Sequence, residues 1–253
     1  MVRVKRKIRI AINLITLNEG SSEDRVTTVK DAILSALWAD RVIVVDGGSN
    51  DDTHALVEEC DGPEGRVIRY DKKWENHFGD QRQEALGITP DNFDWVVRVD
   101  ADEICGPGFS TLRATLAKLP PDIWAVRLRQ TNLYPDAEHY AANLGGWETW
   151  PRIFRRNLPG GNKIVWVGQV HESPKVQGPN GTQDIPAERI MDWSAQMIHF
   201  GWLSRARREE REDLYATIPG SGITGRGDLT NRDFVVRDTP VDVWPLLDGY
   251  REG

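Results

Sequence analysis

Two aspartates stand two positions apart at the end of an apolar segment. Asp100 and Asp102 follow the run Trp95–Val99, and Glu103 comes directly after them. Paired carboxylates at a turn can meet one hard cation from the same side, and Mg²⁺ or Mn²⁺ fills its remaining positions with water and phosphate oxygens. The pair therefore indicates a metal–diphosphate site. The plain alternative is a solvated turn in which an aspartate caps the next helix.

A second polar cluster follows the apolar run Arg41–Val45. Asp46 comes first, and two glycines and Ser49 follow it. Glycine lets a backbone approach a ligand closely, and an aspartate in this place can accept hydrogen bonds from a base or a ribose. The same residues are also typical of a strand-to-helix turn, with Ser49 or Asn50 as the helix cap. Both interpretations stay open at this point.

The elements that must position these clusters alternate over the first hundred residues. Apolar runs predict strands, and apolar residues at helical spacing predict helices between them. The predicted strands are Ile8–Leu14, Arg41–Val45, Val67–Tyr70 and Trp95–Val99, and the predicted helices are Val26–Leu37, Thr53–Cys60 and Phe78–Leu86. This order is typical of an α/β fold with a mostly parallel sheet flanked by helices. Ligands bind beyond the carboxyl ends of such strands, where the polar clusters stand.

The second half of the chain follows a different pattern. Strands are predicted at 123–129, 150–156 and 164–171, and a charged helix at Leu203–Ala216. No internal repeat or clear linker is present, so we predict one domain over 1–217, whose second half forms a smaller acceptor-facing region. We predict a C-terminal tail over 218–253. Its glycine-rich stretch 219–227 is a candidate lid loop, and it is not a dinucleotide fingerprint because no predicted strand precedes it.

Composition narrows the class of protein. The chain has 253 residues, of which 39% are hydrophobic and 28% charged, and this balance excludes a disordered chain. A net charge of −7 argues against a protein that mainly binds nucleic acid. Two cysteines form no disulfide framework, and no apolar run approaches the roughly 20 residues that span a bilayer. We therefore expect a cytoplasmic protein, with peripheral membrane contact open through the arginines of the charged helix.

Four segments together match the pattern of a known family: TLNE at 16–19, RVIVVDGGSNDDT at 41–53, HFGDQRQEAL at 77–86 and WVVRVDADE at 95–103. They resemble the inverting family 2 glycosyltransferases of the GT-A fold. The branch that includes the lipopolysaccharide-core β-glucosyltransferases is most similar. That branch also carries a His-Glu pair, here His171-Glu172, and an isolated histidine before an aromatic residue, here His199-Phe200. The likeness is dense over 8–105, moderate over 150–203 and absent over 204–253.

The resemblance implies roles for residues on the donor side. Asn18, Glu19 and Asp46 would line the nucleotide pocket, and Arg82 would face the donor near its diphosphate. The sequence departs from the family at Gly47, where many relatives have Asp or Ser. This departure leaves the nucleotide base unassigned.

The resemblance also implies roles for the residues nearest the chemistry. Asp100 and Asp102 would hold the ribose and the metal, with Asp102 the firmer metal ligand. His199 would be a further metal or diphosphate contact. Glu172 would be the general base that takes the proton of the acceptor hydroxyl. Glu103 is the rival base, and we expect it to support the metal turn instead.

The resulting hypothesis is a metal-dependent, inverting glycosyltransferase. It would use Mn²⁺ or Mg²⁺ and a nucleotide-diphosphate sugar, by family default a UDP-sugar, with a glycan or glycoconjugate as the acceptor. One competing hypothesis is a sugar-phosphate nucleotidyltransferase, which would normally open with a glycine-rich basic loop after its first strand. Two more are a glycosyltransferase that acts on a modified nucleic-acid base and a non-catalytic binding protein. The binding protein would be expected to have lost the carboxylates that are present here.

Overall fold

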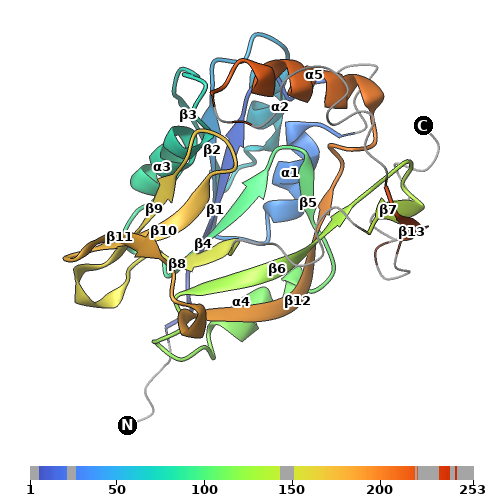
Figure 1. The fold of residues 1–253 in the computed structure, drawn as a ribbon. Coiled ribbons are helices and arrows are strands. Elements are labelled where there is room, and N and C mark those ends of the chain that lie inside the picture. The colour runs from blue at the N-terminus through green and yellow to red at the C-terminus, as the bar shows by residue number, and fades with distance from the viewer. Residues whose placement is uncertain are drawn as a thin grey trace.

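An eight-stranded sheet forms the centre of the protein (Figure 1). The computed structural model describes residues 6–21, 27–142, 151–219, 221, 234–239 and 243. The first hundred residues supply four parallel strands in the spatial order β3-β2-β1-β4. They are β1 (Ile10–Thr16), β2 (Arg41–Asp46), β3 (Val67–Asp71) and β4 (Trp95–Asp100). These strands confirm the four predicted in this part of the chain, with ends that differ by at most two residues.

The second half of the chain completes the same sheet. These strands are β5 (Glu103–Cys105), β6 (Ala125–Asn132), β8 (Ile153–Arg155) and β12 (Ile190–His199). β8 runs antiparallel between β4 and β6, β12 is parallel to β6, and β5 is antiparallel at the edge. The predicted α/β class with a mostly parallel sheet is confirmed. β12 lies outside the predicted strands, because the polar residues Asp192, Ser194 and Gln196 interrupt its apolar ones.

Three helices cover one face of the sheet. They are α1 (Val29–Ala36), α2 (Thr53–Cys60) and α4 (Leu112–Leu116), which follows a short 3₁₀ turn, Phe109–Thr111. Their apolar residues share one buried cluster with β1, β2 and β4. α1 begins three residues later than predicted, because the N-cap is Thr28, whose N–H donates to Asp31 at 2.8 Å. Asp52, rather than Ser49 or Asn50, precedes α2.

A helix and a small sheet cover the other face. α3 (Phe78–Ile88) packs there beside a three-stranded antiparallel sheet of β9 (Lys163–Val167), β10 (Ser173–Gly178) and β11 (Gly181–Asp184). The strand predicted at 164–171 therefore ends at Val167, and a turn follows it. Two more 3₁₀ turns, Pro159–Gly161 and Ala187–Arg189, join strands, and β7 (His139–Ala141) pairs with β13 (Val236–Asp238).

The strand register brings the polar clusters to one edge of the sheet. Thr16 of β1 is level with Asp46 of β2, and Ile15 is level with Asp100 of β4. His199, the last residue of β12, is level with Glu103 of β5. The predicted charged helix is α5 (Arg205–Ala216), which lies across this end of the sheet and is orange in Figure 1.

The C-terminal tail is only partly described. Within the glycine-rich stretch 219–227, only residues 219 and 221 belong to the described part, so the lid prediction falls outside it. Among the helices in the described ranges, none combines the length and apolar character that crossing a bilayer requires.

Candidate active site

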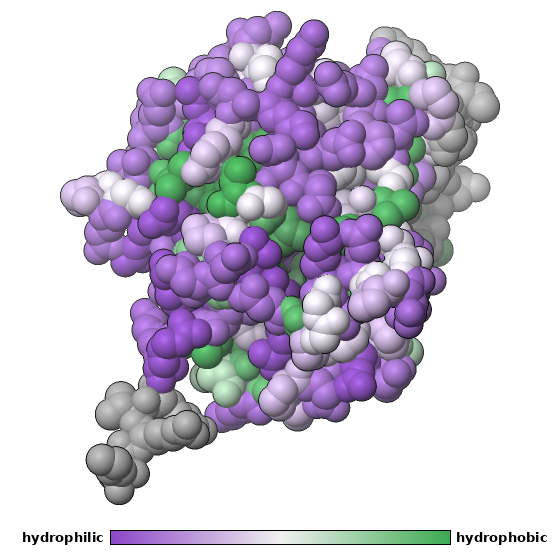
Figure 2. Space-filling model, turned by 90° about the vertical axis from the view of Figure 1, so that its left-hand side faces the viewer, coloured by the Kyte–Doolittle hydropathy of each residue, from purple (hydrophilic) through white to green (hydrophobic). Residues whose placement is uncertain are grey.

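A cavity of about 590 Å³ lies at the edge where the strand ends meet. The loop after β1, the turn after β4, the first turns of α3, the end of β12 and helix α5 line it. Its volume is in the range of small-ligand sites. On the side of the molecule that carries α3 and β9–β11, Figure 2 shows hydrophobic residues gathered in a recess among hydrophilic ones. The site is thus a pocket at the carboxyl end of the parallel strands, as the sequence predicts.

Asp100 ends β4 in the middle of three guanidinium groups. Its Oδ1 is 2.7 Å from Nη2 of Arg82, and its Oδ2 is 2.8 Å from Nη2 of Arg98 and 3.4 Å from Nη1 of Arg152. Burial opposes ionisation of this carboxyl, but the three positive charges outweigh burial and hold its pKa well below the ordinary value. Asp100 is therefore ionised at neutral pH and firmly held.

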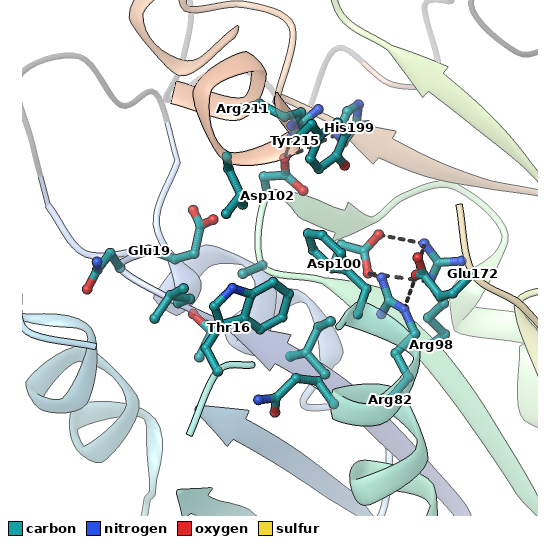
Figure 3. Close-up of a pocket in the computed structure, with 18 of the residues that line it drawn as sticks. Thr16, Glu19, Arg82, Arg98, Asp100, Asp102, Glu172, His199, Arg211 and Tyr215 are labelled. Atoms are coloured by element: carbon teal, nitrogen blue, oxygen red, sulfur yellow. Dashed lines mark hydrogen bonds and ion pairs between the residues drawn. The ribbon is translucent and has the colours of Figure 1, made fainter. Parts of the chain in front are cut away.

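Glu172 lies just before β10 and shares two of these arginines. Arg82 donates from Nε to its Oε1, and Nη2 of Arg98 is 3.9 Å from the same oxygen. In Figure 3, Arg82 and Arg98 lie between Asp100 and Glu172. Burial again opposes ionisation, and the two arginines lower the pKa of Glu172 in spite of it.

Glu103 lies beneath the turn and outside the described lining of the cavity. Arg152 donates to both of its oxygens, at 2.9 and 2.8 Å, Gln130 donates at 2.9 Å, and the N–H of Asp100 donates at 2.9 Å. These donors occupy the carboxylate from all sides. Its contacts agree with the expectation that Glu103 supports the turn.

Asp102 and His199 meet at the other end of the turn. Oδ2 of Asp102 is 3.2 Å from Nε2 of His199 and 2.5 Å from Nη2 of Arg211. Nδ1 of His199 lies 2.7 Å from Oδ1 of Asn132, an acceptor, so this nitrogen carries the proton. The other ring nitrogen, Nε2, faces the carboxylate of Asp102 and is the nitrogen that a metal ion would bind.

The Asp102–His199 pair fits a divalent cation. Carboxylate oxygen and imidazole nitrogen are both common ligands of Mn²⁺, and two protein ligands leave positions for diphosphate oxygens and water. Gly201 provides the space, because a Cβ atom there would lie 2.8 Å from Nε2 of His199 and nearer still to Oδ2 of Asp102. Burial raises the pKa of Asp102, but His199 and Arg211 outweigh burial and hold it well below the ordinary value. The carboxylate is therefore ready to bind a cation.

Asp46 is fully buried and is not among the described residues that line the cavity. Its oxygens accept from the N–H groups of Gly48 and Ser49, both at 2.7 Å, and from the Ser49 hydroxyl at 2.6 Å, and His54 lies 3.0 Å away. Asp46, His54 and Asp71 also hold ligand atoms within 4.8 Å of one another. Because its own loop satisfies Asp46, this group is a poor match for a metal.

Asn18 and Glu19 both line the cavity on the β1 side. Asn18 has a left-handed backbone, its N–H donates to the Ser49 hydroxyl at 2.8 Å, and its Oδ1 accepts from the N–H of Asn50 at 2.9 Å. It therefore ties the loop after β1 to the loop after β2. Glu19 forms an ion pair with Arg207 of α5.

The comparisons with known proteins give this site a family. The sequence pattern of glycosyl transferase family 2 matches residues 12–167. The chain belongs to glycosyl transferase family 2. The matched residues hold most of β1, all of β2–β4, the Asp100–Asp102 turn and Arg82, and they end before Glu172 and His199.

Solved structures match this chain at low sequence identity. S. aureus TarS is 14% identical, with a TM-score of 0.52 over 84% of this chain and 40% of that one. In its match to the TarS fragment solved with UDP-GlcNAc, this chain spans 46% of that fragment. Glucosyl-3-phosphoglycerate synthase from Mycobacterium tuberculosis, solved with Mn²⁺ and UDP-glucose, is 18% identical, with a TM-score of 0.45 over 85% and 81% of the two chains.

Four arginines at or beside the cavity were missed by sequence reasoning. Arg98 gave a signal, because it interrupts an otherwise apolar strand, and a charged residue in a buried strand needs a partner. Arg152 gave no signal, because the carboxylates that its side chain pairs with, Asp100 and Glu103, are far from it in the sequence. Arg207 and Arg211 lie among glutamates in the sequence, a pattern typical of a solvated helix face, yet both line the cavity.

Aromatic residues form part of the same wall. The rings of Trp74 and Phe78 are 4.6 Å apart, those of Phe78 and Tyr215 are 5.8 Å apart, and His171 lies 6.2 Å from Tyr215. All four line the cavity. His171 also has a left-handed backbone, with φ at 54°, in the turn that presents Glu172. Flat rings of this kind suit contact with a base or a sugar.

Proposed function

We propose that this chain is a metal-dependent, inverting glycosyltransferase that moves a sugar from a nucleotide-diphosphate sugar to a hydroxyl group of a glycan or glycoconjugate. The observation that carries the proposal is the Asp102–His199 pair, which opens into the same cavity as Arg82 and Glu172. Family membership supports glycosyl transfer over nucleotidyl transfer. The net charge of −7 supports a glycan over a nucleic-acid acceptor.

In this proposal, residues at different strand ends bind different parts of the donor. Asn18 and Glu19 contact the nucleotide, Asp100 orients its ribose, and Asp102 and His199 hold Mn²⁺ or Mg²⁺. When bound, the ion neutralises negative charge that develops on the leaving nucleoside diphosphate. Arg82 adds positive charge at the same place, since it lies against Asp100. A UDP-sugar is the proposed donor.

Glu172 is the proposed general base. The acceptor oxygen attacks the anomeric carbon from the face opposite the diphosphate, the bond to the diphosphate oxygen breaks, and the hydroxyl proton passes to Glu172. Arg82 and Arg98 keep the pKa of Glu172 low, so it is ionised at neutral pH, the form that accepts a proton. They also make it a weak base, so proton transfer accompanies bond formation and does not precede it. Glu103, the rival base, is not among the described residues that line the cavity, whereas Glu172 is, and this favours Glu172.

The acceptor side follows from the resemblance to the lipopolysaccharide-core branch. We propose an envelope glycan or a lipid-linked sugar as the acceptor, and a cytoplasmic enzyme that works at the membrane surface. The structure gives α5 little part in this: Arg205 is exposed but pairs with Glu209, and the other exposed charged residues of the helix, Glu210 and Asp213, are acidic.

A ligand panel tests the proposal. Thermal unfolding is measured with UDP-glucose, UDP-GlcNAc, GDP-mannose and free UDP or GDP, each with Mn²⁺ and with excess chelator. A ligand at 100 times its Kd stabilises the folded state by about 2.7 kcal/mol. We expect at least one nucleotide to stabilise the chain only when Mn²⁺ is present. If no nucleotide binds with Mn²⁺ or Mg²⁺, or if binding is unchanged in chelator, the proposal is wrong.

A further inference from the structure

Helix α5 turns two arginines and a tyrosine toward the cavity. Arg207, Arg211 and Tyr215 are spaced four residues apart, which places them on one face of the helix, and all three line the cavity. The rest of the helix is held elsewhere. Arg208 is buried, donates to the carbonyl of Trp202 and lies over the ring of Tyr134 at 5.3 Å. Arg207 and Arg211 can therefore change partners by side-chain rotation alone.

Each of the two arginines forms an ion pair with a carboxylate that, in the proposed function, contacts the donor or the metal instead. Arg207 pairs with Glu19, on the nucleotide side. Arg211 pairs with Asp102 at 2.5 Å, and its Nη2 would also lie 2.5 Å from a Cβ atom at position 201. The guanidinium thus stands in the space that Gly201 leaves beside Asp102. It holds the place of a cation there.

The Asp102–Arg211 ion pair affects ligand binding, because breaking it leaves a buried charge without a partner. Arg211 is largely buried, with 19% of its side chain exposed, and a buried cation without a partner is costly. A metal ion that binds Asp102 displaces Arg211 and leaves that cation in the cavity. A diphosphate that binds at the same time supplies the missing anion, and a guanidinium matches phosphate oxygens well.

We propose that Arg211, with Arg207 beside it, is a ligand of the donor diphosphate. Until the donor binds, Asp102 holds Arg211 and Glu19 holds Arg207. Arg211 then makes binding of the metal and of the nucleotide interdependent. Either ligand alone breaks the Asp102–Arg211 ion pair and leaves one of its two charges without a partner, whereas both ligands together give each charge a partner. This inference rests on the proposed function and adds a positioning role for α5. The alternative is that Arg211 only fastens α5 to the turn.

Calorimetric titration separates the two roles. Mn²⁺ and UDP, with GDP in parallel, are titrated singly and each in the presence of the other. The ratio of UDP affinities with and without Mn²⁺ gives the coupling factor, which is typically about 5- to 150-fold where sites communicate. In the wild-type chain we expect coupling in the upper part of this range.

Arg211→Gln removes the stored cation and keeps a polar side chain. We expect it to bind Mn²⁺ alone more tightly than the wild type, to bind UDP in the presence of Mn²⁺ at least about tenfold more weakly, and to lose most of the coupling factor. Arg211→Lys keeps the charge but loses the forked guanidinium, so it should retain only part of the wild-type coupling factor. Arg205→Gln is the matched control, since Arg205 lies on the same helix with 75% of its side chain exposed and pairs with Glu209. It should behave like the wild type.

Two results are decisive against the inference. One is an unchanged coupling factor in Arg211→Gln, and the other is a loss of Mn²⁺ binding in the absence of nucleotide. If Arg211→Gln does not fold, as judged by thermal unfolding, Arg211→Lys decides, because a pure fastening role predicts unchanged coupling for it. A wild-type chain that binds neither UDP nor GDP with Mn²⁺ contradicts the proposed function itself. Normal wild-type binding with unaffected coupling contradicts only the role of Arg211.

Discussion

Asp46, the last residue of β2, and Asp102, just after β4, are both buried aspartates at the same edge of the sheet, but their partners come from different places. Most partners of Asp46 are groups of its own loop, within three residues of it. The partners of Asp102 are His199 and Arg211, which β12 and α5 bring from about a hundred residues away. A carboxylate that accepts its hydrogen bonds from its own loop stabilises that loop. A carboxylate that distant side chains satisfy can exchange them for a ligand.

The same comparison applies to Glu172, the proposed base, and Glu103. Of all the substitutions, we expect the one at Glu172 to have the largest effect on turnover. Glu172→Gln keeps the shape of the side chain and removes the proton acceptor, so turnover should fall by roughly 10²- to 10⁴-fold while donor affinity is nearly kept. Steady-state kinetics and UDP titration measure the two quantities. Glu103→Gln is the control, and it should lower stability and donor binding together. A pure turnover defect in Glu103→Gln, with an active Glu172→Gln, would exchange the two roles.

Asp102 should show the next largest effect. Asp102→Asn removes a charge and little volume, so the chain should stay folded and lose roughly 10²- to 10³-fold of its metal-supported transfer rate. The measurement is the release of nucleoside diphosphate over a series of Mn²⁺ concentrations. Normal turnover in this variant, or full wild-type activity in excess chelator, would contradict the metal assignment.

Asp46 should affect stability more than binding. Asp46→Asn replaces an acceptor that takes two backbone N–H groups and a hydroxyl, so we expect unfolding to become easier by about 1–3 kcal/mol. UDP affinity in the folded variant should stay close to that of the wild type. Urea unfolding and UDP titration measure both. A large loss of UDP affinity with unchanged stability would place Asp46 in the nucleotide pocket, as the family resemblance implies.

A smaller effect is expected in acid, where the two aspartates should act alike. Both have a pKa below the ordinary value of 3.8: burial opposes the shift in each, Ser49 and His54 outweigh it at Asp46, and His199 and Arg211 outweigh it at Asp102. A carboxyl with a lowered folded-state pKa stabilises the fold above its unfolded pKa, and this contribution is lost as the pH falls through the folded value. Unfolding free energy should therefore decline below about pH 4. Either Asn variant should show a shallower decline, and a steeper one would contradict these contacts.

The sequence predicts the first half of the molecule well because its signals are local. Continuous apolar runs predict β1 to β4. Helical spacing predicts α2 and α3, and both helices begin at the predicted residues. The polar residues that follow each strand then meet at one edge, because parallel strands share a direction. Asp100 and Asp102 could be placed at the cavity by this reasoning, and Asn18 and Glu19 with them.

The remaining features depend on contacts between distant residues, and no local pattern carries them. Asp46 and Asp102 look equivalent in sequence, and only the fold distinguishes a carboxylate bound by its own loop from one that faces the cavity. Arg207 and Arg211 alternate with glutamates along α5, which is typical of a solvated helix. Their position in the cavity depends on the fold, because α5 follows β12 and lies across the strand ends.

Mn²⁺ binding in the presence of UDP, followed by electron paramagnetic resonance, tests the central claim most directly. The wild-type chain, Asp102→Asn and Asp46→Asn are compared at equal folded concentration. We expect the wild type and Asp46→Asn to remove free Mn²⁺ from solution beyond what UDP alone removes, and Asp102→Asn to fail to do so. If Asp102→Asn binds Mn²⁺ as the wild type does, or if folded Asp46→Asn loses it, the metal–diphosphate site does not lie at Asp102.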